Sequence, residues 1–243
     1  HWQERRQLLR QLRTPHSIAS NQYEFAWLAL FNHGDLDRAR LLAEEIQTVA
    51  LTINNPGNRH RTLLLFGFLA GLDENYAACR QFFQEIDALN QPYFPFMMSM
   101  QQTGLCLAAC GLDDLPAARQ HLQQVLEISL IHQWPANAVK GLTFAAIIAA
   151  KGGQPERATE LLGLVFHHPL SPKGWLAQWP LITRVRTELE ATVTSERFQA
   201  VWQRGEMLDL LATAKEQLAE LAGENRSLTA VPLTSVSHIC SCL

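Results

Sequence analysis

The stretch Gly111-Leu112-Asp113-Asp114-Leu115-Pro116-Ala117-Ala118 decides the fold, because looser copies of it return at a fixed spacing along the chain. Each copy has a Gly, then polar residues that can cap a helix, and then an Ala that begins an apolar stripe of helical period. The copies lie at residues 34–39, 71–78 and 153–158, so their Ala residues are spaced by 39, 40 and 40 positions. A fixed period of this length is typical of a solenoid of stacked helix pairs. The four Ala residues are Ala39, Ala78, Ala118 and Ala158.

This period predicts an all-α superhelix with four antiparallel helix pairs over residues 20–171, each joined by a short turn. The Gly of each copy is expected to stop the preceding helix, and the recurring Ala is expected at the helix crossing, where a small side chain lets two backbones approach closely. A loop is expected over residues 54–58, which contain Asn-Asn-Pro-Gly-Asn. The first helices are expected over residues 21–32, 60–70, 96–110 and 136–151; later second helices are expected over residues 74–89, 116–132 and 155–166. The helix over residues 74–89 is expected to bury Ala78, Phe82 and Ile86.

Outside these four pairs the regular spacing is lost. Residues 172–222 are interpreted as a degenerate fifth pair and a C-terminal capping helix, with helices over residues 174–189, 195–204 and 207–221. Residues 223–243, rich in Ser and Thr, are expected to be an irregular or disordered tail. Residues 1–19 contain an amphipathic helix that the period assigns to the end of a truncated preceding repeat. We therefore expect a longer protein upstream.

Composition narrows the function classes. The formal net charge of -3 gives no electrostatic reason to expect nucleic-acid binding. No apolar run approaches the roughly 20 residues that a membrane-spanning helix needs. Five cysteines, an odd number without the spacing of a disulfide framework, favour a reducing compartment. We expect a cytoplasmic protein that contacts neither nucleic acid nor a membrane.

Groups that could carry chemistry are few, and each has a structural interpretation. His238, Cys240 and Cys242 are clustered in sequence, but a zinc site needs four ligands in tetrahedral geometry. Cys106 and Cys110 lie one helical turn apart, where packing in the core is favoured over metal binding. The sequence contains neither the phosphate-binding pattern G-x-x-x-x-G-K-[ST] nor the nucleophile pattern G-x-S-x-G. We therefore expect no enzymatic activity, no metal and no cofactor.

The first repeat resembles a tetratricopeptide repeat, since it has an early aromatic residue, a small residue at the crossing, Gly-Asp at the turn and an Ala soon after. The period of about 40, in place of 34, departs from that pattern and indicates longer helices or loops. Residues 157–169 and 197–207 resemble the last repeats of bacterial multidomain signalling ATPases, such as the maltose-operon activator and antibiotic-regulatory-protein families. The resemblance implies a sensor or scaffold within a larger signalling ATPase or transcriptional regulator. The matching residues of the first repeat are Tyr23, Ala26, Gly34, Asp35 and Ala39.

In a solenoid of this kind the first helices line the concave side, and the helical register places a mixture of polar and apolar residues there. We expect this face to bind a protein or peptide segment, including the upstream domains of the same protein. The alternative, implied by the resemblance to the maltose-operon activator, is a domain that senses a small inducer. The residues expected on the concave face are Asn21, Glu24, Leu28, His60, Leu63, Met100, Thr103, Leu107, Lys140, Thr143 and Ile147.

Overall fold

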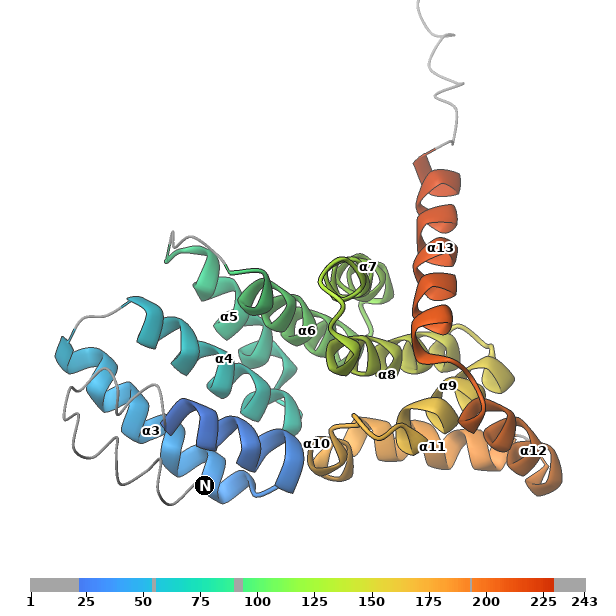
Figure 1. Cartoon of the computed structure of the whole chain (residues 1–243), viewed down its shortest axis with the longest axis horizontal. Coiled ribbons are helices and arrows are strands. Elements are labelled where there is room, and N and C mark those ends of the chain that lie inside the picture. The colour runs from blue at the N-terminus through green and yellow to red at the C-terminus, as the bar shows by residue number, and fades with distance from the viewer. Residues whose placement is uncertain (1–21, 54–55, 90–93, 193, 230–243) are drawn as a thin grey trace, which may run out of the picture.

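The computed structural model of the chain describes residues 22–53, 56–89, 94–192 and 194–229. These residues form helices joined by short turns, and the described ranges contain no strand (Figure 1). The predicted all-α superhelix is therefore confirmed. None of the helices in these ranges is long and apolar enough to cross a bilayer.

Four helix pairs follow one another, and each helix packs against the next one in the chain. Helix α4 also contacts α6, and α6 contacts α8, so the first helices of successive pairs touch each other. We call these first helices (residues 22–33, α4, α6 and α8) the inner layer. The pairs are residues 22–33 with α3 (Leu36–Ile53), α4 (Pro56–Leu72) with α5 (Tyr76–Asp87), α6 (Pro95–Gly111) with α7 (Leu115–Ile131), and α8 (Pro135–Lys151) with α9 (Pro155–His167).

The second helices bury the apolar stripe that the period predicts, with one correction. Ala39, Ala118 and Ala158 are fully buried, but in the second pair Cys79 holds this position and Ala78 is partly exposed. The shift arises because Gly71 lies one residue before the end of α4, whereas Gly111 is the last residue of α6, so a register counted from the two glycines is wrong by one residue in α5. The buried stripe of α5 is therefore Cys79, Phe83 and Ile86, in place of the predicted Ala78, Phe82 and Ile86.

The turns between helices also differ from the prediction that Gly71 and Gly111 stop their helices. Gly71 lies inside α4 and Gly111 is the last residue of α6, and neither has a positive φ. A Cβ at Gly71 would overlap the Leu107 side chain, and one at Gly111 would overlap the Tyr76 ring, so both glycines permit close packing. At Gly34 the prediction is confirmed, because this residue ends the first helix with a φ of 67°.

The residues that end α4 and α6 in the left-handed conformation are Glu74 and Asp113, with φ of 60° and 59°. The next N–H in each turn reaches back five residues: Asn75 donates to the Ala70 carbonyl over 2.9 Å, and Asp114 to the Ala109 carbonyl over 3.0 Å. This pattern closes a helix C-terminus by satisfying a carbonyl that would otherwise lack a partner. The side chains of Asn75 and Asp114 then cap the following helices. Each turn thus ends one helix and begins the next.

Three predicted boundaries are wrong. Helix α4 begins at Pro56, inside the predicted loop. Pro fits the first turn of a helix because a backbone N–H at that position would have no acceptor within the helix. The predicted helix over residues 174–189 is divided into α10 (Lys173–Gln178) and α11 (Pro180–Thr192), since a residue before Pro avoids helical geometry.

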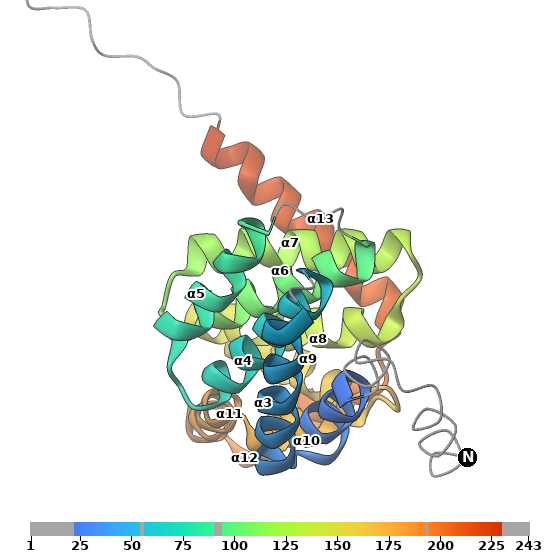
Figure 2. The same cartoon turned by 90° about the vertical axis from the view of Figure 1, so that its left-hand side faces the viewer.

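The third corrected boundary is at the C-terminal end. Helix α12 (Ser195–Glu206) lies where a helix was expected, and α13 (Leu210–Thr229) extends into the segment that was predicted to be irregular. Helix α13 contacts α7 and α8, and its far end projects beyond the rest of the molecule (Figures 1 and 2). The remaining tail residues, 230–243, and the predicted helix within residues 1–19 lie outside the described residues.

The chain closes on itself after the fourth pair. Helix α10 packs against the first helix, and the two lie side by side in both views (Figures 1 and 2). Gly174 of α10 lies so close to Asn32, His33 and Gly34 that a Cβ at this position would overlap their backbone. Next to this contact the Trp175 ring lies 5.6 Å from the Phe31 ring, measured between centroids. We call this contact between α10 and the first helix the closure contact.

Adding one methyl group at the closure contact should destabilise the fold. Gly174→Ala should lower the free energy of unfolding by on the order of 1–3 kcal/mol, because backbone atoms cannot move aside as a flexible side chain can. Gly223→Ala is the matched control, since a Cβ at this helical position meets nothing within 4 Å, and it should be neutral or slightly stabilising. Urea denaturation followed by circular dichroism measures both. Equal stability of the two variants would contradict the closure contact.

Candidate functional site

Most of the residues predicted to line an open concave face are instead buried. The inner helices contact one another and the chain closes on itself, so these side chains pack in the interior. Glu24 is exposed and Leu28 is partly exposed, while Asn21 lies outside the described residues. The expected exposure is therefore wrong for the buried members, and their role in binding stays a prediction. The buried members are His60, Leu63, Met100, Thr103, Leu107, Lys140, Thr143 and Ile147.

The inner layer buries an unusual number of polar side chains along with its apolar ones. Some of their hydrogen bonds stay within one helix: the Thr62 hydroxyl donates to the Asn58 carbonyl over 2.9 Å, and the Thr143 hydroxyl to the Val139 carbonyl over 3.1 Å. Such local bonds satisfy a hydroxyl without a partner from another helix. The buried polar residues of α4, α6 and α8 are Asn58, His60, Thr62, Ser99, Gln101, Thr103, Asn137, Lys140 and Thr143.

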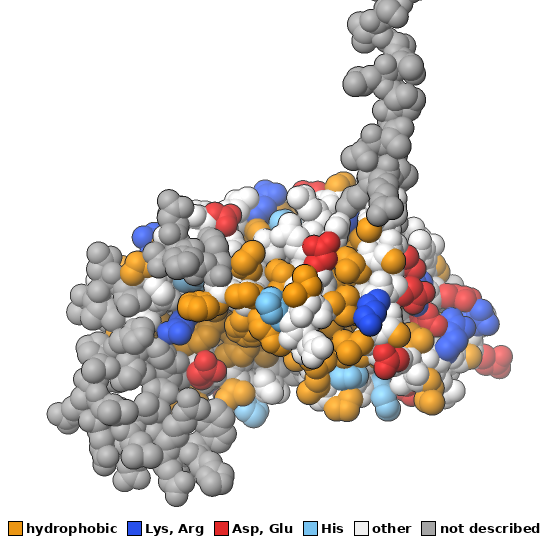
Figure 3. Space-filling model, turned by 45° about the horizontal axis from the view of Figure 1, so that its top comes forward, with side chains coloured by type: hydrophobic (Ala, Val, Ile, Leu, Met, Phe, Trp, Pro, Cys, Tyr) orange, Lys and Arg blue, Asp and Glu red, His pale blue; other side chains and the backbone are white. Residues whose placement is uncertain are grey.

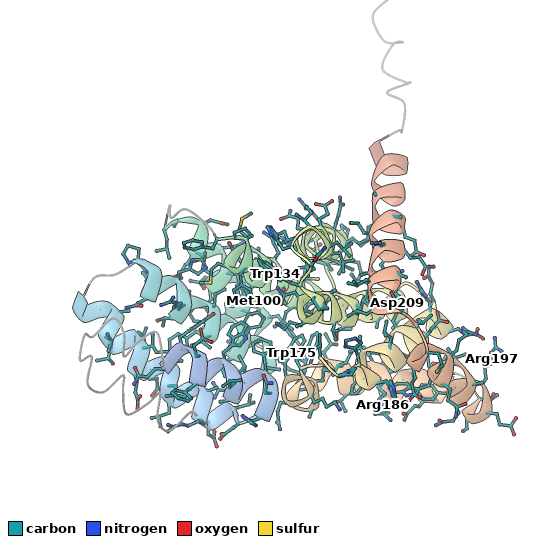
Figure 4. The ribbon with its side chains drawn as sticks, viewed as in Figure 1. Met100, Trp134, Trp175, Arg186, Arg197 and Asp209 are labelled. Atoms are coloured by element: carbon teal, nitrogen blue, oxygen red, sulfur yellow. The ribbon has the colours of Figure 1, made fainter. Side chains whose placement is uncertain are left out.

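Lys140 is the most unusual of these groups, because it is a buried cation held by aromatic rings and an amide. Its Nζ donates to Asn137 Oδ1 over 3.2 Å and lies 3.9 Å from Met100 Sδ. The same atom lies 5.0 Å from the centre of the Phe31 ring and 5.7 Å from that of Trp27. No carboxylate of the described residues forms an ion pair with it. Figure 4 shows Met100 in the central part of the molecule.

Burial shifts the pKa of Lys140 and of other titratable groups in the inner layer. It lowers the pKa of Lys140 from 10.5 to about 8, because the charged ammonium loses its hydration. Burial also raises the pKa of Tyr23 above its ordinary value and lowers that of His60 to about 4. The Tyr23 ring lies 5.6 Å from the Trp27 ring, and its hydroxyl has no hydrogen-bond partner within the described residues. We define the Lys140 cluster as Tyr23, Trp27, Phe31, Met100, Asn137, Lys140 and Trp175.

A second candidate site is a groove of about 540 Å³ where the end of α3 and the end of α5 flank the start of α4. Phe66 and Phe82 stack in it with ring centres 5.9 Å apart, and Leu51 at its edge is 77 % exposed. Arg59 and Glu85 add one charge of each sign. We call it the α3–α5 groove. Its lining residues are Gln47, Ala50, Leu51, Pro56, Arg59, Thr62, Leu63, Phe66, Phe82, Glu85, Ala88 and Leu89.

Sequence reasoning missed this groove for a specific reason. Phe82 was assigned to the buried stripe of its helix, but the one-residue shift in α5 places Phe83 there and leaves Phe82 partly exposed. A usable signal was Leu51, a large apolar residue that lies off the stripe formed by Ala39, Leu42, Ala43 and Ile46. A large apolar residue off the core face of a helix is a reason to look for a contact surface.

Apolar side chains are exposed elsewhere too, and they spread over the face seen in Figure 3. At the start of α6, Phe94 is 75 % exposed, and at the end of α7 Ile131 is 74 % exposed. Between them the Phe96 and Trp134 rings meet edge to face, with centres 5.8 Å apart. These residues do not line the α3–α5 groove, and a hollow suits a binding site better than scattered exposed side chains, so they are weaker candidates.

The cysteines of the described part of the chain are buried, and its potential metal ligands are not grouped. Cys106 and Cys110 are fully buried, as predicted. Burial raises the pKa of the Cys106 thiol well above its ordinary value and that of Cys79 to about 12, which disfavours the reactive thiolate. Among the described residues no group of three or more His, Cys, Asp and Glu side chains is placed to hold a metal. His238, Cys240 and Cys242 lie outside the described residues.

The lowered pKa of Lys140 predicts a specific dependence of stability on pH. Between about pH 8 and pH 10.5 the unfolded state holds more protons at this residue than the folded state, so the stability contributed by Lys140 rises with pH. Lys140→Met should therefore be more stable than the parent at pH 7, and the difference should shrink by on the order of 3 kcal/mol by pH 10.5. Lys215→Met, at an exposed position of α13, should show no such trend. Urea unfolding at a series of pH values measures the difference, and a constant difference would contradict the burial of the charge.

Comparison with known proteins assigns no relative to this chain. No family model matches the sequence, and no curated protein matches it either.

Proposed function

We propose that the chain is a non-enzymatic helical-repeat module that binds an apolar segment of a partner protein in the α3–α5 groove. The observation that carries the proposal is the groove itself, with stacked Phe66 and Phe82 and the exposed Leu51 at its edge. Contiguous exposed apolar surface rimmed by polar residues commonly marks an interaction site. A groove between helices suits the apolar side of an amphipathic segment, whose anchors fill the hollow while its polar side stays in water.

Charges at the groove define the partner further. Arg59 is exposed and Glu85 is partly exposed, and both line the hollow. The matching segment has apolar anchors with an acidic residue that reaches Arg59. Charges at a rim favour the correct partner and orientation more than they raise affinity.

The larger context is also part of the proposal. The resemblance of residues 157–169 and 197–207 to the last repeats of bacterial signalling ATPases supports a scaffold or sensor role within a longer cytoplasmic signalling protein or transcriptional regulator. The closed arrangement of the repeats is compatible with this role, because the module presents its outer surface and its groove rather than an open concave face. The segment bound by the groove then belongs either to an upstream domain or to a separate protein.

A second candidate function is favoured by a different observation, the buried Lys140. A cation without a described carboxylate partner, in the interior of a repeat domain, suits a sensor that binds a small molecule among its inner helices. Buried charges are costly unless they are paired, and a ligand is one source of the missing charge. This candidate uses the inner layer, whereas the first uses the α3–α5 groove.

The groove can be tested without knowing the natural partner. A phage-displayed library of random peptides, selected on the purified chain, should yield peptides with apolar anchors and an acidic residue. Leu51→Asp places a charge at the exposed edge of the hollow and should weaken these peptides by about tenfold or more. Arg59→Glu should weaken the acidic peptides selectively. Fluorescence anisotropy with labelled peptides measures both effects.

The matched control for Leu51→Asp is Ile131→Asp, which alters an equally exposed apolar residue outside the groove. This variant should bind the selected peptides as the parent does. Selection of no peptides, or peptides that lose affinity equally with both variants, would show that the α3–α5 groove is not the binding surface.

A further inference from the structure

We propose that the Lys140 cluster binds a small monocarboxylate with an apolar body, so that the ligand's carboxylate takes the place of the missing counter-ion. The inference rests on the second candidate function, the small-molecule sensor, and names the class of ligand and its anchor. Three observations carry it: the unmet hydrogen-bonding capacity of Lys140, two further buried donors on rings that pack against Trp27 and Phe31, and the nature of the surrounding side chains.

The Lys140 ammonium group makes fewer good hydrogen bonds than it has donors. Lysine has three N–H donors and no acceptor. Within the described residues Nζ donates to one amide oxygen, Asn137 Oδ1 at 3.2 Å, and to a thioether sulfur, Met100 Sδ at 3.9 Å. A thioether is a weak acceptor, so the positive charge remains poorly satisfied. An anionic oxygen is the group that would satisfy it best.

The amide in this contact is itself held in place. Asn137 Nδ2 donates to Ser99 Oγ over 3.3 Å, which turns the amide oxygen toward the ammonium. Asn137 is buried on α8 and Ser99 is buried on α6, so the bond joins two inner helices. The direction of the Lys140 side chain is therefore fixed by the fold, as a ligand-binding group requires.

The Lys140 cluster also contains two buried polar atoms that lack a hydrogen-bond partner in the described part of the chain. The Tyr23 hydroxyl and the Trp175 Nε1 are buried and have no hydrogen-bond partner within the described residues. The Phe31 ring connects this tryptophan to the lysine, since its centre lies 5.6 Å from the Trp175 ring and 5.0 Å from Nζ. Ammonium, indole and phenol groups are all donors, so their shared need is for an acceptor. A carboxylate accepts hydrogen bonds and donates none.

The side chains of the cluster limit the charge and shape of the ligand. The cluster contains one cation, and its other members are aromatic rings, a thioether and an amide. Arg61 lies 5.5 Å from the centre of the Tyr23 ring, but Lys140 is the cation at the contact with Asn137 and Met100. One carboxylate matches the single charge at that contact. The aromatic and thioether surfaces favour an aliphatic or aromatic body. Figure 4 shows Met100 and Trp175, from α6 and α10, in the same central region.

The helices that contribute side chains to the Lys140 cluster indicate where a ligand enters it. Trp27 and Phe31 lie on the first helix and Trp175 on α10, so the closure contact joins both sides of the cluster. The first helix is π-helical from Leu28 to His33, next to this contact. π-Helical turns are frequent at functional sites. A ligand thus reaches Lys140 where the first helix and α10 meet.

The test uses sodium butyrate and sodium benzoate as probes, at constant total sodium and pH 7, with butyramide and benzamide as uncharged isosteres. At least one acid should produce a saturable rise in melting temperature of several degrees, and neither amide should do so. With methionine methyl groups labelled with carbon-13, the same titration should shift the Met100 signal and leave that of Met207, which is 86 % exposed, unchanged.

Variants connect the response to the cluster. Lys140→Met should abolish the shift of Met100, and Trp175→Phe, which removes the indole N–H and keeps an aromatic ring, should weaken the acid at least severalfold. Lys215→Met is the matched control on an exposed part of α13 and should respond as the parent does. Acid binding should also weaken above pH 8 as Lys140 loses its proton.

The proposal is overturned if neither acid gives a saturable shift, if the amides act as strongly as the acids, or if Lys140→Met keeps the response. Two variants distinguish failure of this proposal from failure of the proposal that the α3–α5 groove binds peptides. Leu51→Asp should leave the acid response intact, and Lys140→Met should still bind the selected peptides.

Discussion

The closure contact between Gly174 and the end of the first helix is the constraint on which the rest of the structure depends. Stacked helix pairs leave an exposed concave side and two exposed ends, and each pair is stabilised mainly by its neighbours. Here α10 returns to the first helix, so the chain's first pair gains a neighbour from the other end of the sequence. Two glycines permit this approach, since a side chain at Gly174 would overlap the backbone around Gly34.

Burial of the inner layer follows from this constraint, and so does its unusual chemistry. In an open superhelix Lys140, Thr103 and Thr143 would face water, where a polar side chain has no desolvation cost. In the closed form they are buried, and the hydroxyls turn to carbonyls of their own helices. The Lys140 ammonium does not bond to a carbonyl of its own helix in this way. Its neighbours are aromatic rings, an amide and a thioether sulfur, and none of these is an anion. The lowered pKa of Lys140 thus has the same origin as its burial in the closed fold.

The repeat period made most of the fold predictable, because each helix pair depends on contacts that are local in sequence. The stripes of α3, α7 and α9 followed from the spacing of Ala39, Ala118 and Ala158. The register of α5 did not, because Gly71 lies one residue before the end of α4 whereas Gly111 is the last residue of α6, so counting from the two glycines misplaces the stripe by one residue. Gly71 and Gly111 were correctly singled out but were given the wrong role: they make room for Leu107 and Tyr76, which only the three-dimensional packing reveals.

The candidate sites were less predictable, and the reason is again the closure contact. It joins residues near 34 to residues near 174, and no periodic signal connects these positions. Without it, the inner helices were expected to be open, and Lys140 was one member of a long surface set. With it, Lys140 becomes a buried charge whose surroundings lie on both sides of the contact.

This placement distinguishes the two candidate sites by the energy that binding requires. The α3–α5 groove is already open, so a partner can bind it without changing the fold. In the proposed site a ligand enters where the first helix and α10 meet, so these helices must part to admit it and then close around it, because the cluster takes side chains from both. The same requirement couples ligand binding to the arrangement of the two ends of the repeat region. A charged group buried behind a closure made by distant segments is therefore better suited to sensing than to simple adhesion, since occupancy and conformation change together.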